Sequence, residues 1–543
     1  MMRMRWAALV GAATMSFGAC ADDQPAPPPE GMTVHLFGPN PPNDPFSGVG
    51  HIILKMTGDG LEQPLTTTAD YVPGGSASLD LIPFSAPGQK RTLVVEGWTD
   101  AGGKPGFLLS RGRAKPLEVR IDSAEAELDV LLGKVNSFLP LISSNTKASQ
   151  QLTQGRIGHA VAVGPNEIVV LGGGIISNPS TAWWGGSGYP LLSSVEAIDL
   201  QTFEVSPRPD MKLERVWHTA STLSSGQIII AGGYDESGQA SSTVELYNPP
   251  GVLNGEPVAL LPMRAARAAH TATLISDETR QILFVGGDSS GTWELWDPVN
   301  GSPDGTKPLL DGLPRRHHTA TTFFLEGRSE PAVLITGGET GTTVHSTAML
   351  YDSVANQMVP ISDAMPGGAR TQHTAVFVPG RNFIYIAGGF TDVNRTSATA
   401  SIDVFDVGRK VNDQASPGFV QGNGAFRMRT ARGGQAAALL PDNVVVMAGG
   451  AGAEGTSPGF RPLGSLEVIH EFVNAETFTL EIQVASSYTG GGLSQVPYLP
   501  TDRIGHRIVA LDSGMALVIG GAAPAQSGGG YQLIRELSLY NPQ

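Results

Sequence analysis

The sequence contains six copies of the pattern Arg-x-x-His, whose side chains are the clearest candidates for taking part in chemistry. An imidazole can bind a metal ion or transfer a proton, so six copies could suggest a ring of metal ligands or of catalytic histidines. Because the pattern recurs along the chain instead of converging in one motif, we interpret these residues as serving a repeated structural unit. The pairs are Arg156 and His159, Arg215 and His218, Arg267 and His270, Arg315 and His318, Arg370 and His373, and Arg503 and His506.

Each copy precedes a short apolar run that ends in a pair of glycines. This apolar run with its glycine pair occurs seven times. In the sixth copy the first element reads Arg432-Gly433-Gly434-Gln435, without the histidine. A further strand pattern follows each of the last six glycine pairs, and most of these strands end in an aromatic residue followed by Asp or Asn. The first glycines of the pairs are 51 to 71 residues apart, and they are Gly172, Gly232, Gly286, Gly337, Gly388, Gly449 and Gly520.

Together, the Arg-x-x-His element, the glycine pair and the aromatic-Asp strand resemble the kelch motif. The resemblance implies an all-β fold in which residues 136–543 form a seven-bladed kelch-type β-propeller, with the Arg and His of each copy tying the blades together. The last repeat ends after its third strand. We therefore expect residues 135–142, which precede the first repeat, to supply the missing strand and close the ring.

The N-terminus has the features of an export signal. Arg3 and Arg5 precede a 12-residue apolar stretch that is too short to span a bilayer. Residues 17–20, ending in the only cysteine, Cys20, resemble the lipobox of bacterial lipoproteins. We predict a lipoprotein signal peptide over residues 1–19 that is not part of the fold, lipidation at Cys20, and a proline-rich tether over 20–31. The alternative is a plain secretory signal cut after Ala21.

Residues 32–135 alternate apolar and polar side chains with the period of half-buried strands. Glycine-rich turns separate these strands at spacings that suit an antiparallel sandwich. We predict a small immunoglobulin-like β-sandwich before the repeats, with strands that include 51–56, 76–82, 91–98, 117–121 and 126–130. A sandwich followed by a kelch ring also resembles the layout of galactose oxidase-like proteins. Their tyrosine–cysteine crosslink cannot be carried over, because the repeat region has no cysteine.

The formal net charge of −15 and the lack of a basic run argue against a nucleic-acid partner. We expect contact with a membrane only through the lipid anchor. Short-spaced metal-ligand motifs do not occur, and we predict neither a metal nor a cofactor. Residues 450–455 match the dinucleotide pattern G-x-G-x-x-G, but the prolines that follow cannot start a phosphate-binding helix, so we interpret the stretch as a loop.

The departures from the repeat are the candidate binding residues. The loop after the first glycine pair holds Trp183, Trp184 and Tyr189, and a later insert holds Arg461. Exposed aromatic rings can stack on sugars or anchor a protein partner, or they can fold back into the channel. We expect an exported, lipid-anchored binding or scaffolding module for a protein or glycan at the cell envelope, in the periplasm or on the surface. The alternative is a carbohydrate-active enzyme of the mutarotase or epimerase type that uses the central cleft.

Overall fold

The structure is a computed structural model. The chain folds into two compact units. The smaller unit contains residues 1–149, 511–515 and 539–543, and the larger contains 150–510 and 516–538. The model describes residues 2–7, 33–41, 43–59, 61–71, 78–80, 90–114, 127–176, 188–249, 257–420, 426–452, 461–473, 480–485, 497–525 and 531–542.

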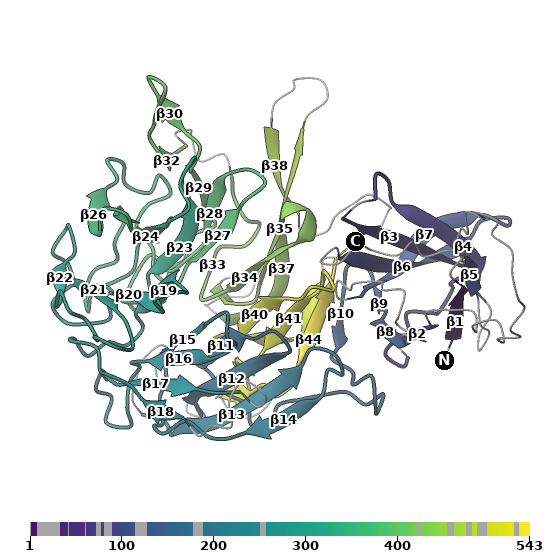
Figure 1. The fold of residues 1–543 in the computed structure, drawn as a ribbon, viewed down its shortest axis with the longest axis horizontal. Coiled ribbons are helices and arrows are strands. Elements are labelled where there is room, and N and C mark those ends of the chain that lie inside the picture. The colour runs from purple at the N-terminus through teal and green to yellow at the C-terminus, as the bar shows by residue number, and fades with distance from the viewer. Residues whose placement is uncertain are drawn as a thin grey trace, which may run out of the picture. The chain divides into compact units, whose positions relative to one another are not determined.

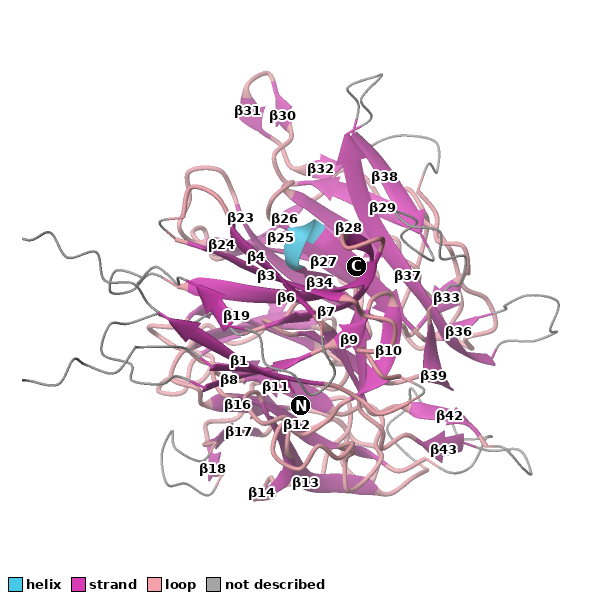
Figure 2. Ribbon diagram, turned by 90° about the vertical axis from the view of Figure 1, so that its right-hand side faces the viewer, coloured by secondary structure: helices cyan, strands magenta, loops and turns pink. Residues whose placement is uncertain are grey.

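Strands dominate both units, and the described residues include no α-helix (Figure 2). In the part of the chain that the structure describes, the single helical turn is the 3₁₀ segment η1 (Pro441–Asn443). The all-β class predicted from the sequence is therefore confirmed, and the many four-stranded sheets make the fold propeller-like. Among the described residues no helix is long and apolar enough to cross a membrane.

Two sheets make up most of the smaller unit. One sheet has the order β5-β1-β2-β8, and the other has the order β4-β3-β6-β7-β9. Their strands are β1 (Met2–Ala7), β2 (Thr33–Phe37), β3 (His51–Gly58), β4 (Leu65–Asp70), β5 (Ser78–Asp80), β6 (Arg91–Asp100), β7 (Pro105–Arg113), β8 (Glu127–Leu131) and β9 (Gly133–Lys134).

Apolar side chains from both sheets form one core in the smaller unit. Val34 of β2 and Val130 of β8 belong to the same buried cluster as Ile52 of β3 and Val95 of β6. The expected sandwich is antiparallel, but β2 and β8 run parallel. The physical reason is the long connection between them, because the chain builds β3 to β7 before it returns beside β2, and parallel pairs require such a crossover.

The strand β1 differs from the expectation that residues 1–19 lie outside the fold. It pairs antiparallel with β2, with Met2 opposite Leu36, and parallel with β5. Without β1, β2 would be an edge strand with unpaired backbone groups, and an extended segment of the chain can satisfy them. The export signal and the predicted domain boundaries stay predictions.

The larger unit begins each of its seven repeats with an antiparallel hairpin, and the first strands lie innermost around a common centre (Figure 1). Each hairpin ends at the glycine pair, which turns the chain with positive φ at both glycines. The hairpins are β11 (Ala160–Val163) with β12 (Glu167–Gly174), β15 (Thr219–Thr222) with β16 (Ile228–Ala231), β19 (Thr271–Ser276) with β20 (Gln281–Val285), β23 (Thr319–Phe324) with β24 (Pro331–Thr336), β27 (Thr374–Val378) with β28 (Phe383–Ala387), β34 (Ala436–Leu440) with β35 (Val444–Ala448), and β40 (Arg507–Ala510) with β41 (Ala516–Ile519).

In the first six repeats a third and a fourth strand complete the sheet on its outer side. These outer strands are β13 (Leu191–Asp199) and β14 (Val205–Arg208), β17 (Val244–Tyr247) and β18 (Val258–Ala259), β21 (Thr292–Trp296) and β22 (Lys307–Pro308), β25 (Ala348–Asp352) and β26 (Gln357–Pro360), β29 (Ile402–Asp406) and β32 (Gly418–Phe419), and β37 (Arg461–Val473) and β38 (Leu480–Ala485). Short additional strands are β30 (Lys410–Val411), β31 (Gln414–Ala415), β33 (Arg432–Gly433), β36 (Ala451–Gly452), β39 (Tyr498–Arg503), β42 (Ala522–Pro524) and β43 (Tyr531–Leu533).

Packing between neighbouring sheets explains why the second strands are almost entirely apolar. All four residues of β16 are buried, and Ile228 and Ile230 share a cluster with Val169 and Leu171 of β12 in the preceding repeat. Each fully buried aliphatic side chain contributes about 1.5–3 kcal/mol relative to exposure. A sheet with two apolar faces is stable only between two neighbours, so the repeats depend on one another.

A backbone hydrogen bond of one type joins each repeat to the next. The second glycine of a pair donates its N–H to the carbonyl oxygen of the following repeat's arginine, as Gly173 does to Arg215 at 2.9 Å. The same bond joins the last repeat to the first, because Gly521 N donates to Arg156 O at 2.9 Å. Leu152 N also donates to Arg535 O at 2.8 Å. The two ends of the larger unit are therefore connected.

The last strand of the chain also meets the segment expected to complete it. β10 (Ser137–Pro140) is the hydrogen-bonded neighbour of β44 (Ser538–Asn541). The rings of Phe138 and Tyr540 lie 5.3 Å apart, and Asn541 Nδ2 donates to Gly133 O at 2.6 Å. The prediction from the chain ends that residues 135–142 pair with the final strand is confirmed.

Candidate functional site at the channel mouth

The repeat arginines form a buried layer that binds within each sheet. In every repeat the guanidinium donates to the carbonyl oxygen of the first glycine of the same pair, for example from Arg215 Nη1 to Gly232 O at 2.7 Å. These bonds satisfy carbonyls at the end of the hairpin that have no strand partner there. The seven arginines, which we call the arginine layer, are Arg156, Arg215, Arg267, Arg315, Arg370, Arg432 and Arg503.

Carboxylates neutralise most of this layer. Arg215 Nη2 lies 2.6 Å from Glu245 Oε1, and both side chains are almost completely buried. The acid usually comes from the third strand of the same sheet, while Arg315 instead pairs with Asp311 on its own segment. The other pairs are Arg156 with Glu196, Arg267 with Glu294 and Asp288, Arg370 with Asp403, and Arg432 with Glu467.

Four of the six repeat histidines, His270, His318, His373 and His506, link neighbouring sheets. His270 Nε2 lies 3.2 Å from Thr219 Oγ1 of the preceding repeat, and His506 Nε2 lies 3.0 Å from Ala448 O. The glutamine of the sixth repeat does the same work, because Gln435 Nε2 donates to Ala387 O at 2.7 Å. Burial lowers the pKa of His270, His373 and His506 to about 3, so these imidazoles are neutral at pH 7.

The residue directly before each repeat histidine, or before Gln435, adopts a left-handed conformation. Its φ lies between 50° and 67° in all seven repeats. Three repeats place glycine there, and four carry a side chain in a region that costs about 1–2 kcal/mol for an L residue. We call these seven residues the mouth ring: Gly158, Trp217, Ala269, His317, Gln372, Gly434 and Gly505.

A chain of backbone hydrogen bonds runs along the mouth ring and explains the shared φ. Trp217 N donates to Gly158 O at 2.8 Å, and Ala269 N donates to Trp217 O at 2.9 Å. The series continues through His317 and Gln372 to Gly434, each N–H donating to the carbonyl of the preceding member. The left-handed conformation directs the backbone N–H and C=O of each residue along the ring. The repeat therefore imposes this conformation whatever the side chain is.

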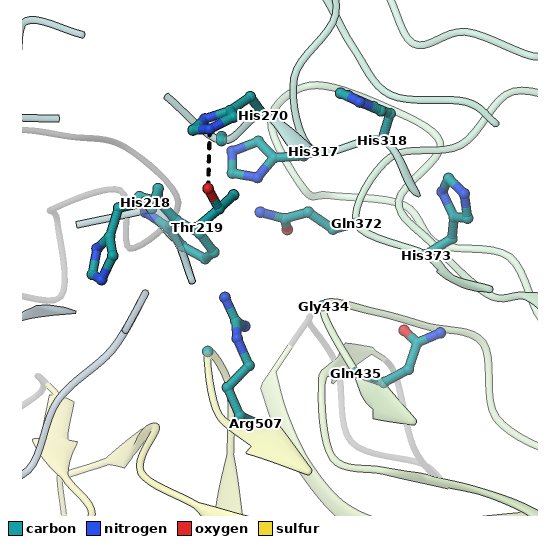
Figure 3. Close-up of a pocket in the computed structure, with 13 residues that line it drawn as sticks. His218, Thr219, His270, His317, His318, Gln372, His373, Gly434, Gln435 and Arg507 are labelled. Carbon is teal, nitrogen blue, oxygen red and sulfur yellow. Dashed lines mark hydrogen bonds between the residues drawn. The ribbon is translucent and has the colours of Figure 1, made fainter. Parts of the chain in front are cut away.

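A cavity of about 240 Å³ opens at the mouth ring (Figure 3). His317 and Gln372 extend into it from the ring, and Arg507 extends into it from the start of β40 (Figure 3). A wider channel of about 610 Å³ continues along the first strands, and alanine and valine side chains line much of it. Arg507 lines both spaces, so it marks the boundary between a polar mouth and a more apolar channel.

Two of the polar side chains of the mouth, His317 and Arg507, pack against Trp217. The rings of Trp217 and His317 meet edge to face with centroids 5.0 Å apart, and the Arg507 guanidinium lies 5.8 Å from the Trp217 ring centroid. Both amide atoms of Gln372 are buried without a hydrogen-bond partner among the described residues. Burial lowers the pKa of Arg507 to about 10, which leaves it charged at pH 7.

The binding residues predicted from the sequence fall in different places. Tyr189 packs at the mouth in the cluster that contains Trp217, burial raises its pKa well above the ordinary value, and a hydrogen bond with Trp217 acts in the opposite direction. Arg461 is exposed at the start of β37 and does not line the cavity. Trp183, Trp184 and Cys20 lie outside the described residues.

The sequence analysis did not single out Trp217, His317, Gln372 or Arg507. The usable signal was local: Trp217, His317 and Gln372 stand inside an Arg-x-x-His element, at a position where three other repeats carry glycine. In the part of the chain that the structure describes, no group of three His, Cys, Asp or Glu side chains is arranged to hold a metal ion.

No protein-family model matches this chain, and no curated protein matches it. Solved structures do match. One of them, titled "Structure of YjhT", aligns over 72% of this chain and 96% of its own, with 12% sequence identity and a TM-score of 0.39.

Proposed function

We propose that the larger unit is a seven-bladed kelch-type β-propeller preceded by an immunoglobulin-like β-sandwich. The repeated backbone link from each glycine pair to the next arginine supports this interpretation, because it occurs seven times and returns from Gly521 to Arg156. The repeated hairpins support it as well, since each places its first strand toward the common centre (Figure 1).

We propose that this propeller is the binding module of an exported, lipid-anchored kelch-repeat protein that takes a protein or glycan ligand at the cell envelope. One observation carries the proposal. Gln372 holds a left-handed φ of 50° and a buried amide that has no partner among the described residues, although glycine occupies the same position in three other repeats. Both features reduce stability, and costly residues of this kind concentrate at functional sites.

Binding of a glycan panel tests the proposal when the full chain is compared with Gln372→Gly. The variant removes the amide and relieves the backbone, so we expect a melting temperature at or above that of the wild type together with weaker binding. Arg280→Gly is the matched control, because Arg280 has a φ of 54° in the turn between β19 and β20. Binding that is equal in wild type and Gln372→Gly would refute a site at the mouth.

A protein ligand requires a second assay. Envelope extract passed over the immobilised wild-type protein and over Gln372→Gly should yield a species that only the wild type retains, and its binding must then be reproduced with the purified species. Failure of both the glycan and the protein assay would refute the binding module.

A carbohydrate-active enzyme of the mutarotase or epimerase type is the second candidate, and one observation favours it. His317 and Arg507 converge on the same cavity, where an imidazole could move a proton and a guanidinium could hold a sugar oxygen. Exchange between sugar anomers, followed by NMR with wild type and His317→Asn, tests this candidate. Asparagine tolerates the left-handed φ, so a rate that stays at the uncatalysed value in both proteins would refute the enzyme.

Lipid anchoring is tested separately. Radiolabelled palmitate should be incorporated into the expressed chain and not into Cys20→Ser. Incorporation into neither protein, with the signal still removed, would favour the plain secretory alternative.

A further inference from the structure

Arg507 breaks the repeat at a position where the other repeats carry only small residues. It directly follows His506, and the corresponding residue directly follows each repeat histidine or Gln435 elsewhere. An arginine in this place extends a long cationic side chain across the mouth (Figure 3). The corresponding residues are Ala160, Thr219, Thr271, Thr319, Thr374 and Ala436.

The surroundings of Arg507 leave its charge without a carboxylate. No described Asp or Glu lies within ion-pair distance of this guanidinium, whereas six of the seven members of the arginine layer have such a partner. Its contacts are the Trp217 ring and a 3.4 Å hydrogen bond to His506 O. The described residues that line the cavity include no acidic side chain.

Neighbouring groups add hydrogen-bonding capacity, and the guanidinium groups closest in sequence are already paired. Arg316, which precedes His317, shares the buried carboxylate of Glu339 with Arg395, at 3.3 and 2.7 Å. The charge of Asp392 also acts on Arg395, so these guanidinium groups, unlike Arg507, have carboxylates nearby. Gln372 adds a buried amide N–H₂ with no protein acceptor among the described residues. A positive mouth in a chain of net charge −15 favours a negatively charged ligand.

We propose that the mouth of the larger unit binds a small organic oxyanion, a carboxylate or a phosphate ester, with Arg507 pairing to the anionic group and the Gln372 amide donating to it. The planar fork of a guanidinium matches the two oxygens of either group. Trp217 holds the arginine from one side, so the fork is positioned before the ligand arrives. This inference rests on the proposed binding function and specifies its ligand class.

Isothermal titration of the full chain tests the inference with probes that differ in one group: glucose, glucuronate and glucose 6-phosphate, with acetate and inorganic phosphate as minimal anions. We expect at least one of the four anions to bind at least tenfold more tightly than glucose, and to bind more weakly as sodium chloride is added. Arg507→Ala reproduces the alanine of the first and sixth repeats and should weaken that binding about tenfold to a hundredfold.

Arg427→Ala is the charge-matched control, because Arg427 is exposed and does not line the cavity. Glucose that binds as well as glucuronate and glucose 6-phosphate, an equal loss in Arg507→Ala and Arg427→Ala, or no anion bound at ten millimolar would each overturn the oxyanion site. The glycan and extract assays report on binding without requiring an anion. A mouth that binds neutral glycans would therefore remove this inference and leave the proposed function intact.

Discussion

The arginine layer and the mouth ring lie two residues apart in every repeat, yet they differ in almost every physical property. Every member of the arginine layer is a buried arginine, and carboxylates neutralise most of them. The mouth ring keeps one backbone conformation and varies its side chain from glycine to tryptophan. The comparison separates what the repeat needs from what this protein adds to it.

The difference also shows how a regular ring acquires an irregular site. Six of the seven mouth-ring residues, all except Gly158, line the same cavity, so side chains at these positions can meet there. Glycine suits the conformation best, and each departure from glycine has a cost in stability. Trp217, His317 and Gln372 are such departures, and the proposed binding function accounts for the cost of His317 and Gln372, while Trp217 also packs in a buried cluster.

Removing one member of the arginine layer should have the largest effect. In Arg215→Leu the Glu245 carboxylate stays buried without its partner, and Gly232 O loses a donor. We expect the free energy of unfolding to fall by about 3–5 kcal/mol, measured by chemical denaturation.

Two further variants sharpen this prediction. The double change Arg215→Leu with Glu245→Leu should recover part of the loss, because no buried charge is left alone. Arg503 has no ion pair with a described carboxylate, so Arg503→Leu should cost less, about 1–3 kcal/mol. Equal losses in Arg215→Leu and Arg503→Leu would show that the carboxylates do not distinguish the members of this layer.

The histidines that link the sheets should make the fold sensitive to acid. The folded-state pKa of His270 is about 3, below the unfolded value near 6.5, so the unfolded chain binds the extra proton between these values. Stability is therefore fully present above about pH 6.5 and declines as the pH falls toward 3. For one such histidine the loss between pH 7 and pH 5 is roughly 2 kcal/mol.

His270→Gln tests this with a replacement that the protein already uses, because Gln435 makes the equivalent link in the sixth repeat. We expect the difference in unfolding free energy between pH 7 and pH 5 to shrink by about 2 kcal/mol, measured by urea denaturation at both values. An unchanged pH dependence would mean that His270 becomes protonated without a cost in the folded state.

Much of the structural layer could be predicted from the sequence because its residues recur. The spacing of Arg-x-x-His and the glycine pairs located the hairpins, and the chain ends located the pairing of β10 with β44. The buried acids could also have been predicted. Glu245 stands in the apolar strand pattern Val-Glu-Leu-Tyr, and a carboxylate that is buried in such a strand needs a partner of opposite charge.

The mouth could not be derived in the same way. A left-handed φ is readable only where glycine marks it, so Gly158 and Gly434 hint at a conformation that Trp217 and Gln372 conceal. Arg507 looks like an ordinary polar residue at the start of a strand, and only the ring geometry brings it beside Trp217, nearly 300 positions earlier in the chain. Sequence reasoning instead selected aromatic residues in a long loop, because these stand out by composition.

The smallest predicted effect compares two adjacent alanines that belong to different layers. Ala269 is a member of the mouth ring with a φ of 50°, whereas Ala268 is buried and has no positive φ. Ala269→Gly relieves the backbone and should raise the free energy of unfolding by up to about 1 kcal/mol. Ala268→Gly only adds freedom to the unfolded chain and removes a buried methyl group, so it should lower that free energy by about 1 kcal/mol.

The two changes in unfolding free energy should have opposite signs. This difference is informative because each variant deletes one methyl group from a buried position, and the two positions are adjacent. Chemical denaturation of the two proteins under one set of conditions removes most systematic error from the difference. If Ala269→Gly destabilises the protein as much as Ala268→Gly, the left-handed conformation is not costly at this position. Gln372 and His317 would then adopt this conformation without a cost, and only ligand binding could assign a function to the mouth.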